Sequence, residues 1–162
     1  MKRIFPINMK IGQIQGIISI LKEFDGSMSL QELSDESFLQ VDDIVNILEA
    51  CKTLGILKVK KQYITLDKKL INKSQHEISV KIRDRITRIE PFSQIKRNIK
   101  KTNGISTTEL FHSLIDKGLI NYRDNMLGIE SFKKDLLITG LRLGILSYDH
   151  ENDVWKLATK KD

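Results

Sequence analysis

The tetrapeptide Leu54-Gly55-Ile56-Leu57 decides the fold, because it ends a helix and opens a β-hairpin. Before it, residues 42–54 carry apolar side chains at helical spacing, with Val41, Ile44, Leu48 and Cys51 on the face that we expect to be buried. After it, residues 56–60 and 63–66 alternate apolar and polar side chains, which predicts two short strands joined by a tight turn. Glycine at position 55 is typical of a helix stop.

Upstream of this passage the sequence predicts two more helices. Residues 9–24 carry a stripe of apolar residues three and four apart, and Gly26 ends that segment. Ser29-Leu30-Gln31-Glu32 then has the pattern of a capping box, in which a serine and a glutamate satisfy each other's backbone amides at a helix start. The order helix, helix, helix, hairpin is typical of a winged helix-turn-helix module.

The same order returns in the second half of the chain. A helix begins after Pro91, a second capping box is expected at Ser106-Thr107-Thr108-Glu109, and a third helix is expected over residues 130–143. Phe132, Leu136 and Leu143 should face inward on that helix. Leu143-Gly144-Ile145-Leu146 repeats the first tetrapeptide and leads into a hairpin over 145–148 and 154–157. We interpret the two halves as an internal duplication, with a longer second-copy segment around 118–127. Unrelated modules with similar local patterns are the alternative.

Between the halves, residues 77–89 predict a bridging helix with isoleucines at positions 78, 82, 86 and 89. The predicted fold is therefore mostly α with small β-hairpin wings (α+β), built from tandem winged helix-turn-helix modules. The first module is expected over residues 1–73, the bridging helix over 74–90 and the second module over 91–162.

Composition narrows the class of protein. The 162 residues contain 27 Lys and Arg against 21 Asp and Glu, a net charge of +6, and 40% are hydrophobic. This balance excludes a disordered chain, and no apolar run is long enough to cross a bilayer. The start Met1-Lys2-Arg3 does not lead into a signal peptide, and the single cysteine excludes an internal disulfide. We expect a cytoplasmic protein without direct membrane insertion.

No pattern for catalysis or cofactor binding stands out. The chain has neither G-x-x-x-x-G-K-[ST] nor G-x-G-x-x-G, so it should not bind ATP alone. Its three histidines fall in different predicted elements, and Cys51 lies on an apolar stripe. His150 with Glu151 and Asp153 could in principle gather a cation, but a polar hairpin turn is the better explanation of these residues. We therefore expect no enzyme, no cofactor and no metal site.

Positive charge is concentrated in residues 81–101, where only Asp84 and Glu90 oppose eight basic residues. One interpretation is the solvated faces of two helices, and the other is a surface that contacts nucleic-acid phosphates. The eight are Lys81, Arg83, Arg85, Arg88, Lys96, Arg97, Lys100 and Lys101.

The third helix of a DNA-reading winged helix enters the major groove. In the first copy this helix exposes Asn46 and the carboxylates Asp42, Asp43 and Glu49, which repel phosphates, although its wing holds lysines. The second copy has a basic helix and an acidic wing with Asp149, Glu151 and Asp153. We predict that Lys133, Lys134 and Arg142 approach double-stranded DNA, and that flanking phosphates are contacted by Lys96, Arg97, Lys100 and Lys101.

Three stretches also resemble a known family. They are Ile11-Gly12-Gln13-Ile14-Gln15-Gly16-Ile17-Ile18-Ser19-Ile20-Leu21 after Pro6, the passage from Leu48 to Leu57 with Tyr63-Ile64-Thr65-Leu66, and the final Ile145-Leu146-Ser147-Tyr148-Asp149 with Val154-Trp155-Lys156-Leu157. Over roughly residues 4–158 the chain resembles the AAA-associated C-terminal domain appended to ATP-binding subunits of nitrate/sulfonate/taurine-type ABC transporters. It departs from that family at Ile138-Thr139-Gly140-Leu141-Arg142-Leu143, where a Trp-Gly-Arg-Tyr-like stretch is replaced.

The resemblance implies a regulatory or interaction module without ATPase activity of its own. Its partner would be an ABC-type ATPase or a second copy of the chain. Two hypotheses follow from the sequence. The first is a non-enzymatic regulatory winged-helix protein that binds DNA, and the second is a protein-interaction module related to transporter ATPases.

Overall fold

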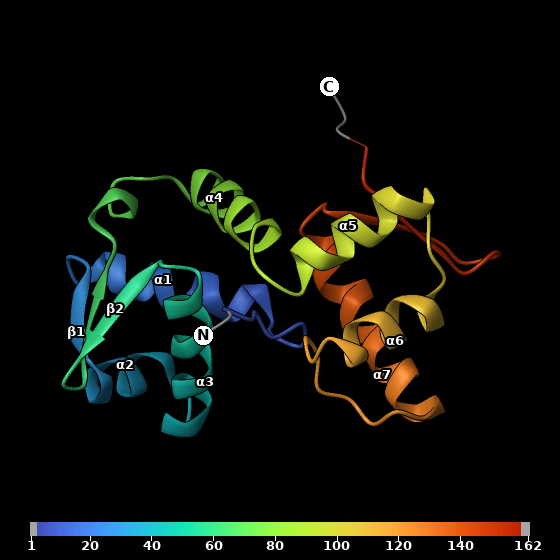
Figure 1. Ribbon diagram of the computed structural model, residues 1–162. Helices are drawn as coiled ribbons and strands as arrows, with labels where there is room; N and C mark the ends of the chain where they lie inside the picture. The colour runs from blue at the N-terminus through green and yellow to red at the C-terminus, as the bar shows by residue number, and fades with distance from the viewer. Residues whose placement is uncertain (1–2, 160–162) are drawn as a thin grey trace. The chain divides into compact units, whose positions relative to one another are not determined.

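The computed structural model describes residues 3–159 and has an α+β fold. Its described part holds seven α-helices, a three-stranded and a two-stranded antiparallel sheet (Figure 1). The chain forms two compact units. We call Met9–Ile82 the small unit, and the segment before Met9 together with the chain from Arg83 onward the large unit. In the described residues, no helix is long and apolar enough to cross a membrane.

The small unit combines three helices with a three-stranded sheet (Figure 1). Two predictions for this unit are confirmed. The isoleucines of the first helix are buried, and a capping box at Ser29 starts the second helix. The elements are α1 (Ile11–Glu23), β1 (Ser27–Ser29), α2 (Leu30–Ser37), α3 (Val41–Thr53), β2 (Leu57–Lys60), β3 (Tyr63–Leu66) and the 3₁₀ turn η1 (Lys68–Leu70).

Two features of the small unit differ from the prediction. Strand β1 was not predicted, because a three-residue Ser-Met-Ser segment has no readable alternation; it exists by pairing with β3, where Met28 lies opposite Ile64. On α3, Ile44, Leu48 and Cys51 are buried as expected. The prediction for Val41 is wrong, since 40% of this residue is exposed. Val41 is the first residue of α3, and the buried stripe begins one turn later at Ile44.

The predicted hairpin of the small unit is confirmed as β2 and β3, which pair from Leu57↔Leu66 to Lys60↔Tyr63. Lys61 and Gln62 connect them with φ values of +49° and +62°. Positive φ at both central residues matches the right-handed twist of the strands, so the turn can be this short.

The large unit contains three complete helices, the last turn of a fourth and the second hairpin (Figure 1). The helix predicted between the halves is observed as α4, whose residues up to Ile82 belong to the small unit and whose last turn belongs to the large unit. The elements are α4 (Gln75–Thr87), α5 (Phe92–Thr102), α6 (Thr107–Asp116), α7 (Met126–Leu136), the π-helical turn η2 (Leu137–Leu141), β4 (Leu146–Asp149) and β5 (Val154–Leu157).

The third helix of the second half differs from its prediction at both ends. It starts at Met126, where the Asn125 side chain accepts a hydrogen bond from the Gly128 amide at 2.9 Å. It turns into the π-helical η2 after Leu136, and Leu143 is only half-buried. At the start of α6, Ser106 accepts a hydrogen bond from the Glu109 amide, which is one of the two hydrogen bonds of the expected capping box.

Aromatic side chains form the core of the large unit. Phe111 and Phe132 meet edge to face with ring centroids 5.5 Å apart, and Trp155 of β5 is fully buried. The segment before Met9 joins this core, because Phe5 lies 6.5 Å from Phe92 between ring centroids. The Phe5 amide donates to the Glu90 carbonyl at 2.7 Å, and Thr139 donates to the Ile7 carbonyl.

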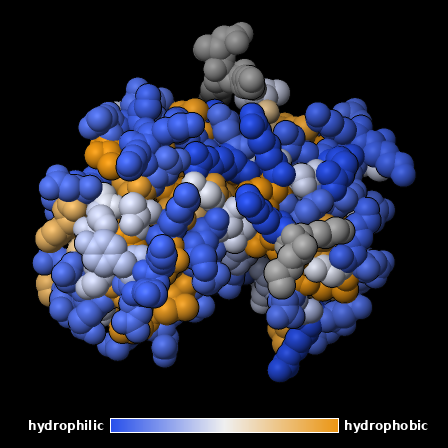
Figure 2. Space-filling model, turned by 60° about the vertical axis from the view of Figure 1, so that its left-hand side comes forward, coloured by the Kyte–Doolittle hydropathy of each residue, from blue (hydrophilic) through white to orange (hydrophobic). Residues whose placement is uncertain are grey.

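The surface is mainly hydrophilic. On the face that Figure 2 shows, hydrophobic residues emerge only as scattered patches among hydrophilic ones. Among the exposed large hydrophobic residues, Phe38 stands out at 94% exposure, followed by Met126 and Leu127 at 73% and 71%.

Two glycines should respond in opposite ways to alanine. At Gly12 in α1 an added Cβ meets nothing within 4 Å, whereas at Gly128 in α7 it would lie 1.7 Å from the Arg123 carbonyl oxygen. Gly12→Ala should therefore raise the free energy of unfolding by about 0.5–1 kcal/mol through helix propensity. Gly128→Ala should lower it by at least about 2 kcal/mol, because backbone must move.

Urea denaturation of both variants, followed by circular dichroism, measures the two changes. A Gly128→Ala variant as stable as the wild type would contradict the packing of residue 123 against α7.

Candidate nucleic-acid interface

The large unit carries a groove with basic side chains along one side, which we call the basic groove. Its volume is about 920 Å³, and Arg83, Lys96 and Lys100 line it together with Asp84 as the acidic residue. The other lining residues are Thr87, Gly144, Ile145, Leu157, Ala158 and Thr159. Three cations against one carboxylate give this groove a net positive charge.

Helix periodicity places the cations in the basic groove. On α5, Ile95 and Ile99 are buried, so the neighbouring Lys96 and Lys100, four residues apart, project from another face. On α4, Arg83 and Thr87 are likewise four apart and follow the buried Ile82 and Ile86.

A glycine in the turn before β4 lines the basic groove next to α4. Gly144 has a φ of +68°, and a Cβ placed on it would lie 4.0 Å from Arg83 Nη1. The guanidinium group therefore lies over the turn between η2 and β4. Among residues 3–159, no carboxylate forms an ion pair with Lys96 or Lys100. Their charges are available to an anionic ligand.

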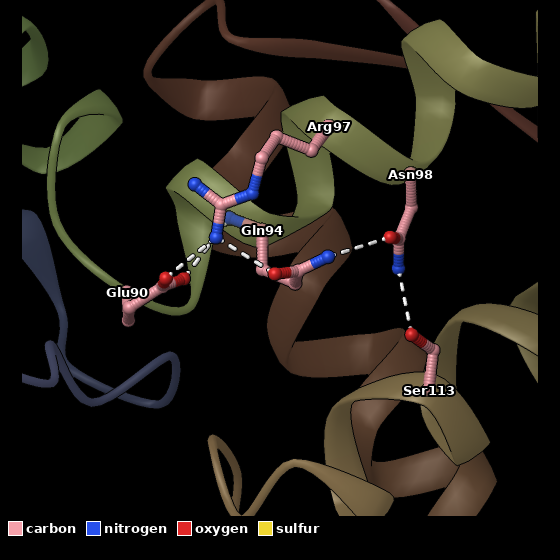
Figure 3. Close-up of polar contacts among 5 residues, drawn as sticks. All are labelled: Glu90, Gln94, Arg97, Asn98 and Ser113. Carbon is pink, nitrogen blue, oxygen red and sulfur yellow. Dashed lines mark hydrogen bonds and ion pairs between the residues drawn. The ribbon is translucent and has the colours of Figure 1, made fainter.

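Arg97, which the sequence analysis placed with these lysines, is engaged within the unit (Figure 3). Its Nη2 lies 2.7 Å from Glu90 Oε1 and donates to Gln94 Oε1 at 2.7 Å. Gln94 then donates to Asn98, which donates to Ser113 of α6 at 2.8 Å. This chain of hydrogen bonds joins the turn before α5 to α5 and α6. Arg97 therefore holds the helices together and has its charge balanced by Glu90.

The Glu90 carboxylate is stabilised in its charged form. Burial alone raises the pKa of Glu90, but hydrogen bonds from Arg97 and Ser93, the Arg97 charge and the Gln94 amide outweigh it. The pKa of Glu90 is lowered as a result. The Glu90 side chain is 19% exposed and that of Arg97 is 58% exposed, so solvent screens this interaction in part.

Lys133 of α7 is also held by its own unit. Its Nζ lies 4.9 Å from the centroid of the Tyr148 ring in β4. The hydrogen bond to Tyr148 and the nearby Asp153 raise the pKa of Lys133 against the effect of burial. Lys133 is therefore a cation that packs on the hairpin, with Tyr148 as its main neighbour.

Asp153 connects the hairpin to α6. Its carboxylate accepts hydrogen bonds from the side chains of Thr107 and Tyr148, and the Thr107 hydroxyl accepts one from Trp155 Nε1 at 2.9 Å. Burial raises the pKa of Asp153, but these donors and Lys133 lower it further than burial raises it. Asp153 is thus occupied by structural hydrogen bonds.

Five of the predicted site residues lie outside the basic groove. Two of them, Lys133 and Arg97, are held by Tyr148 and Glu90. Lys134 on α7, Arg142 after η2 and Lys101 near the end of α5 are exposed, but none of them lines the groove. The structure therefore brings Lys96 and Lys100 together, and adds Arg83, which the sequence analysis counted as basic but did not select. The one signal for Arg83 was its place next to Ile82 in the apolar stripe of α4.

The sequence raises a cation site at His150, Glu151 and Asp153 but predicts neither a metal site nor a reactive thiol. Cys51 is fully buried, and burial raises the pKa of its thiol to about 12. Within the described residues, no group of three or more His, Cys, Asp or Glu side chains is arranged to hold a metal ion.

The Glu90–Arg97 pair predicts a pH-dependent stability. A carboxyl whose pKa is lowered on folding stabilises the protein above its unfolded pKa, near 4.5, and this contribution is lost as the pH falls through the folded pKa. Glu90→Gln should therefore lower the free energy of unfolding at pH 7 by about 1–2 kcal/mol and by clearly less at pH 3. Urea denaturation at both pH values measures the difference.

Glu109→Gln is the control, because Glu109 is exposed on α6 and, among residues 3–159, no side chain bonds to its carboxylate. An equal loss at pH 7 and pH 3 for Glu90→Gln would argue against a stabilised carboxylate.

Comparison with known proteins adds no relative. No family model, no curated protein and no solved structure matches the chain. The function is therefore inferred from the charges, the burial and the geometry described above.

Proposed function

We propose that the chain is a non-enzymatic regulatory protein of two winged-helix modules that binds double-stranded DNA through the basic groove of the large unit. The order of elements supports the winged-helix interpretation. Each unit has three helices followed by an antiparallel hairpin, α1–α3 with β2–β3 and α5–α7 with β4–β5. The observation that carries the DNA proposal is the clustering of Arg83, Lys96 and Lys100.

The distribution of charge between the units supports the same choice. The small unit contains ten basic and ten acidic residues and is neutral. The large unit contains 17 basic and 11 acidic residues and so carries the whole net charge of +6. A polyanion is attracted to the large unit over distances of about 8–10 Å at ordinary salt.

The proposed contacts are to phosphates. Arg83, Lys96 and Lys100 bind the DNA backbone, while the exposed Lys101, Lys134 and Arg142 contact phosphates further along the duplex. Lys133 and Arg97 act through the structure of the unit, because Tyr148 and Glu90 hold them. On α7 the first exposed side chains are Met126 and Leu127, which offer no hydrogen bonds to base edges. We therefore expect binding with little sequence preference.

Salt dependence tests the proposed contacts. Each lysine that binds a phosphate releases counterions, so log K falls by about 0.9 per log unit of salt for each contact. Lys96→Gln with Lys100→Gln should weaken binding and reduce the slope by about 1.8. Fluorescence anisotropy with a labelled duplex, titrated at several salt concentrations, measures both quantities.

The matched control is Lys58→Gln with Lys60→Gln, which removes the same charge from exposed positions on β2 of the small unit. If the two double variants had equal effects, DNA binding would depend only on the net charge of the protein and not on the basic groove. Absence of binding at low salt would end the DNA proposal.

A second candidate function is protein interaction, as the family resemblance suggests. It is favoured by apolar side chains along α7 and η2, where Ile138 and Leu141 are 45% and 40% exposed in addition to Met126 and Leu127. Exposed apolar residues on one helix are typical of a docking surface. The partner would be an ABC-type ATPase or a second copy of the chain.

Sedimentation velocity tests the case of a second copy. If α7 docks against itself, the wild type should form a dimer at micromolar concentration, and Leu127→Ser with Ile138→Ser should make it monomeric. A monomer at all concentrations would exclude this partner.

A further inference from the structure

An exposed apolar surface also lies on the small unit, at the start of α3 and in the turn before it. Phe38 is 94% exposed, and Val41 and Val45 are 40% and 41% exposed. Val41 and Val45 are four residues apart on one face of α3. Phe38 lies three residues before Val41, in the turn between α2 and α3. We call these three residues the α3 docking face.

The fold itself gives no reason for phenylalanine at position 38. Phe38 is the C-cap residue of α2 and has a φ of +60°, in the left-handed region that favours glycine or asparagine. A side chain with a Cβ is strained there. An almost fully exposed ring gains little burial in return. A residue that costs stability and contributes no packing is best explained by binding.

The charges that flank this face along the chain are all of one sign. From residue 23 to residue 51 the chain holds eight carboxylates and neither lysine nor arginine. Lys52 forms an ion pair with Glu49 at 3.1 Å, at the far end of α3. Near the apolar residues stand Asp35, Glu36, Asp42 and Asp43, all of them exposed.

Two ligand classes fit this combination poorly. Phosphates are repelled by the carboxylates, which separates the face from the DNA contacts of the large unit. A cation alone would not use the phenylalanine and the two valines. The complementary ligand carries both apolar and basic side chains.

We propose that the α3 docking face binds a basic amphipathic helix of a partner protein. Apolar side chains of that helix cover Phe38, Val41 and Val45, as in other helix-recognition surfaces. Its lysines and arginines face the surrounding carboxylates and speed the encounter. Phe38 supplies most of the affinity, because large aromatic residues dominate protein interfaces.

The probe is a fluorescently labelled peptide of leucine and lysine, about 18 residues or five helical turns long, with leucines along one face. Fluorescence anisotropy with the whole protein should show binding. Phe38→Ala with Val45→Ala should weaken it at least about tenfold. The matched control is Val59→Ala with Tyr63→Ala, because these residues are 36% and 51% exposed on the same unit but lie among lysines. It should bind like the wild type.

Two further peptides separate the apolar and the charged contributions. Replacing leucine by serine, or lysine by glutamate, should abolish binding in either case. Equal binding of the serine peptide would overturn the proposal, because charge alone would then suffice. Equal effects of the two double variants would overturn it as well. The same holds if Phe38→Ala with Val45→Ala abolishes self-association of the protein but leaves peptide binding unchanged.

Phe38→Gly tests whether Phe38 costs stability and serves binding. Because this variant should be more stable than the wild type, weaker binding cannot result from a folding defect. The substitution should raise the thermal midpoint by about 2–4 °C, since glycine accepts a positive φ. The same variant should bind the leucine–lysine peptide at least about tenfold more weakly. A variant that keeps full affinity would show that Phe38 is not part of the binding surface.

Discussion

The ion pair between Arg97 and Glu90 is the interaction on which the basic groove depends. It fixes the turn between α4 and α5, and the hydrogen-bonded chain through Gln94 and Asn98 carries that constraint to α6. With α5 fixed in this way, Lys96 and Lys100 project from one face and meet Arg83 of α4. The charge of Arg97 is therefore paired within the fold, whereas the charges of Lys96 and Lys100 on the same helix are available to a ligand.

The two units put similar elements to different uses. The large unit carries all of the net positive charge, and the small unit is neutral but has six of its ten carboxylates on α2 and α3. The same third-helix position is therefore acidic and apolar in one unit and partly basic in the other. The proposed DNA contact of the large unit and the proposed partner contact of the small unit fit this separation.

The sequence predicted the helices and hairpins because their apolar periodicity and their caps are local. It missed β1, which depends on pairing with β3, and the exposure of Val41, which depends on where the core ends. For the site, composition located the basic stretch. It could not show which cations are paired within the fold and which are available to a ligand. Arg97 is engaged through Glu90, seven residues away, and Lys133 through the ring of Tyr148 on a distant strand. Both depend on tertiary contacts that no local pattern encodes.

The most direct test of the account is to map the DNA contact by NMR. Amide chemical shifts of the whole protein are followed during titration with a short duplex at low salt. The account predicts changes in α4 from Arg83 onward, in α5 and in the turn around Gly144, with α2 and α3 unchanged. Changes centred on α3, or changes confined to the β2–β3 hairpin of the small unit, would contradict it.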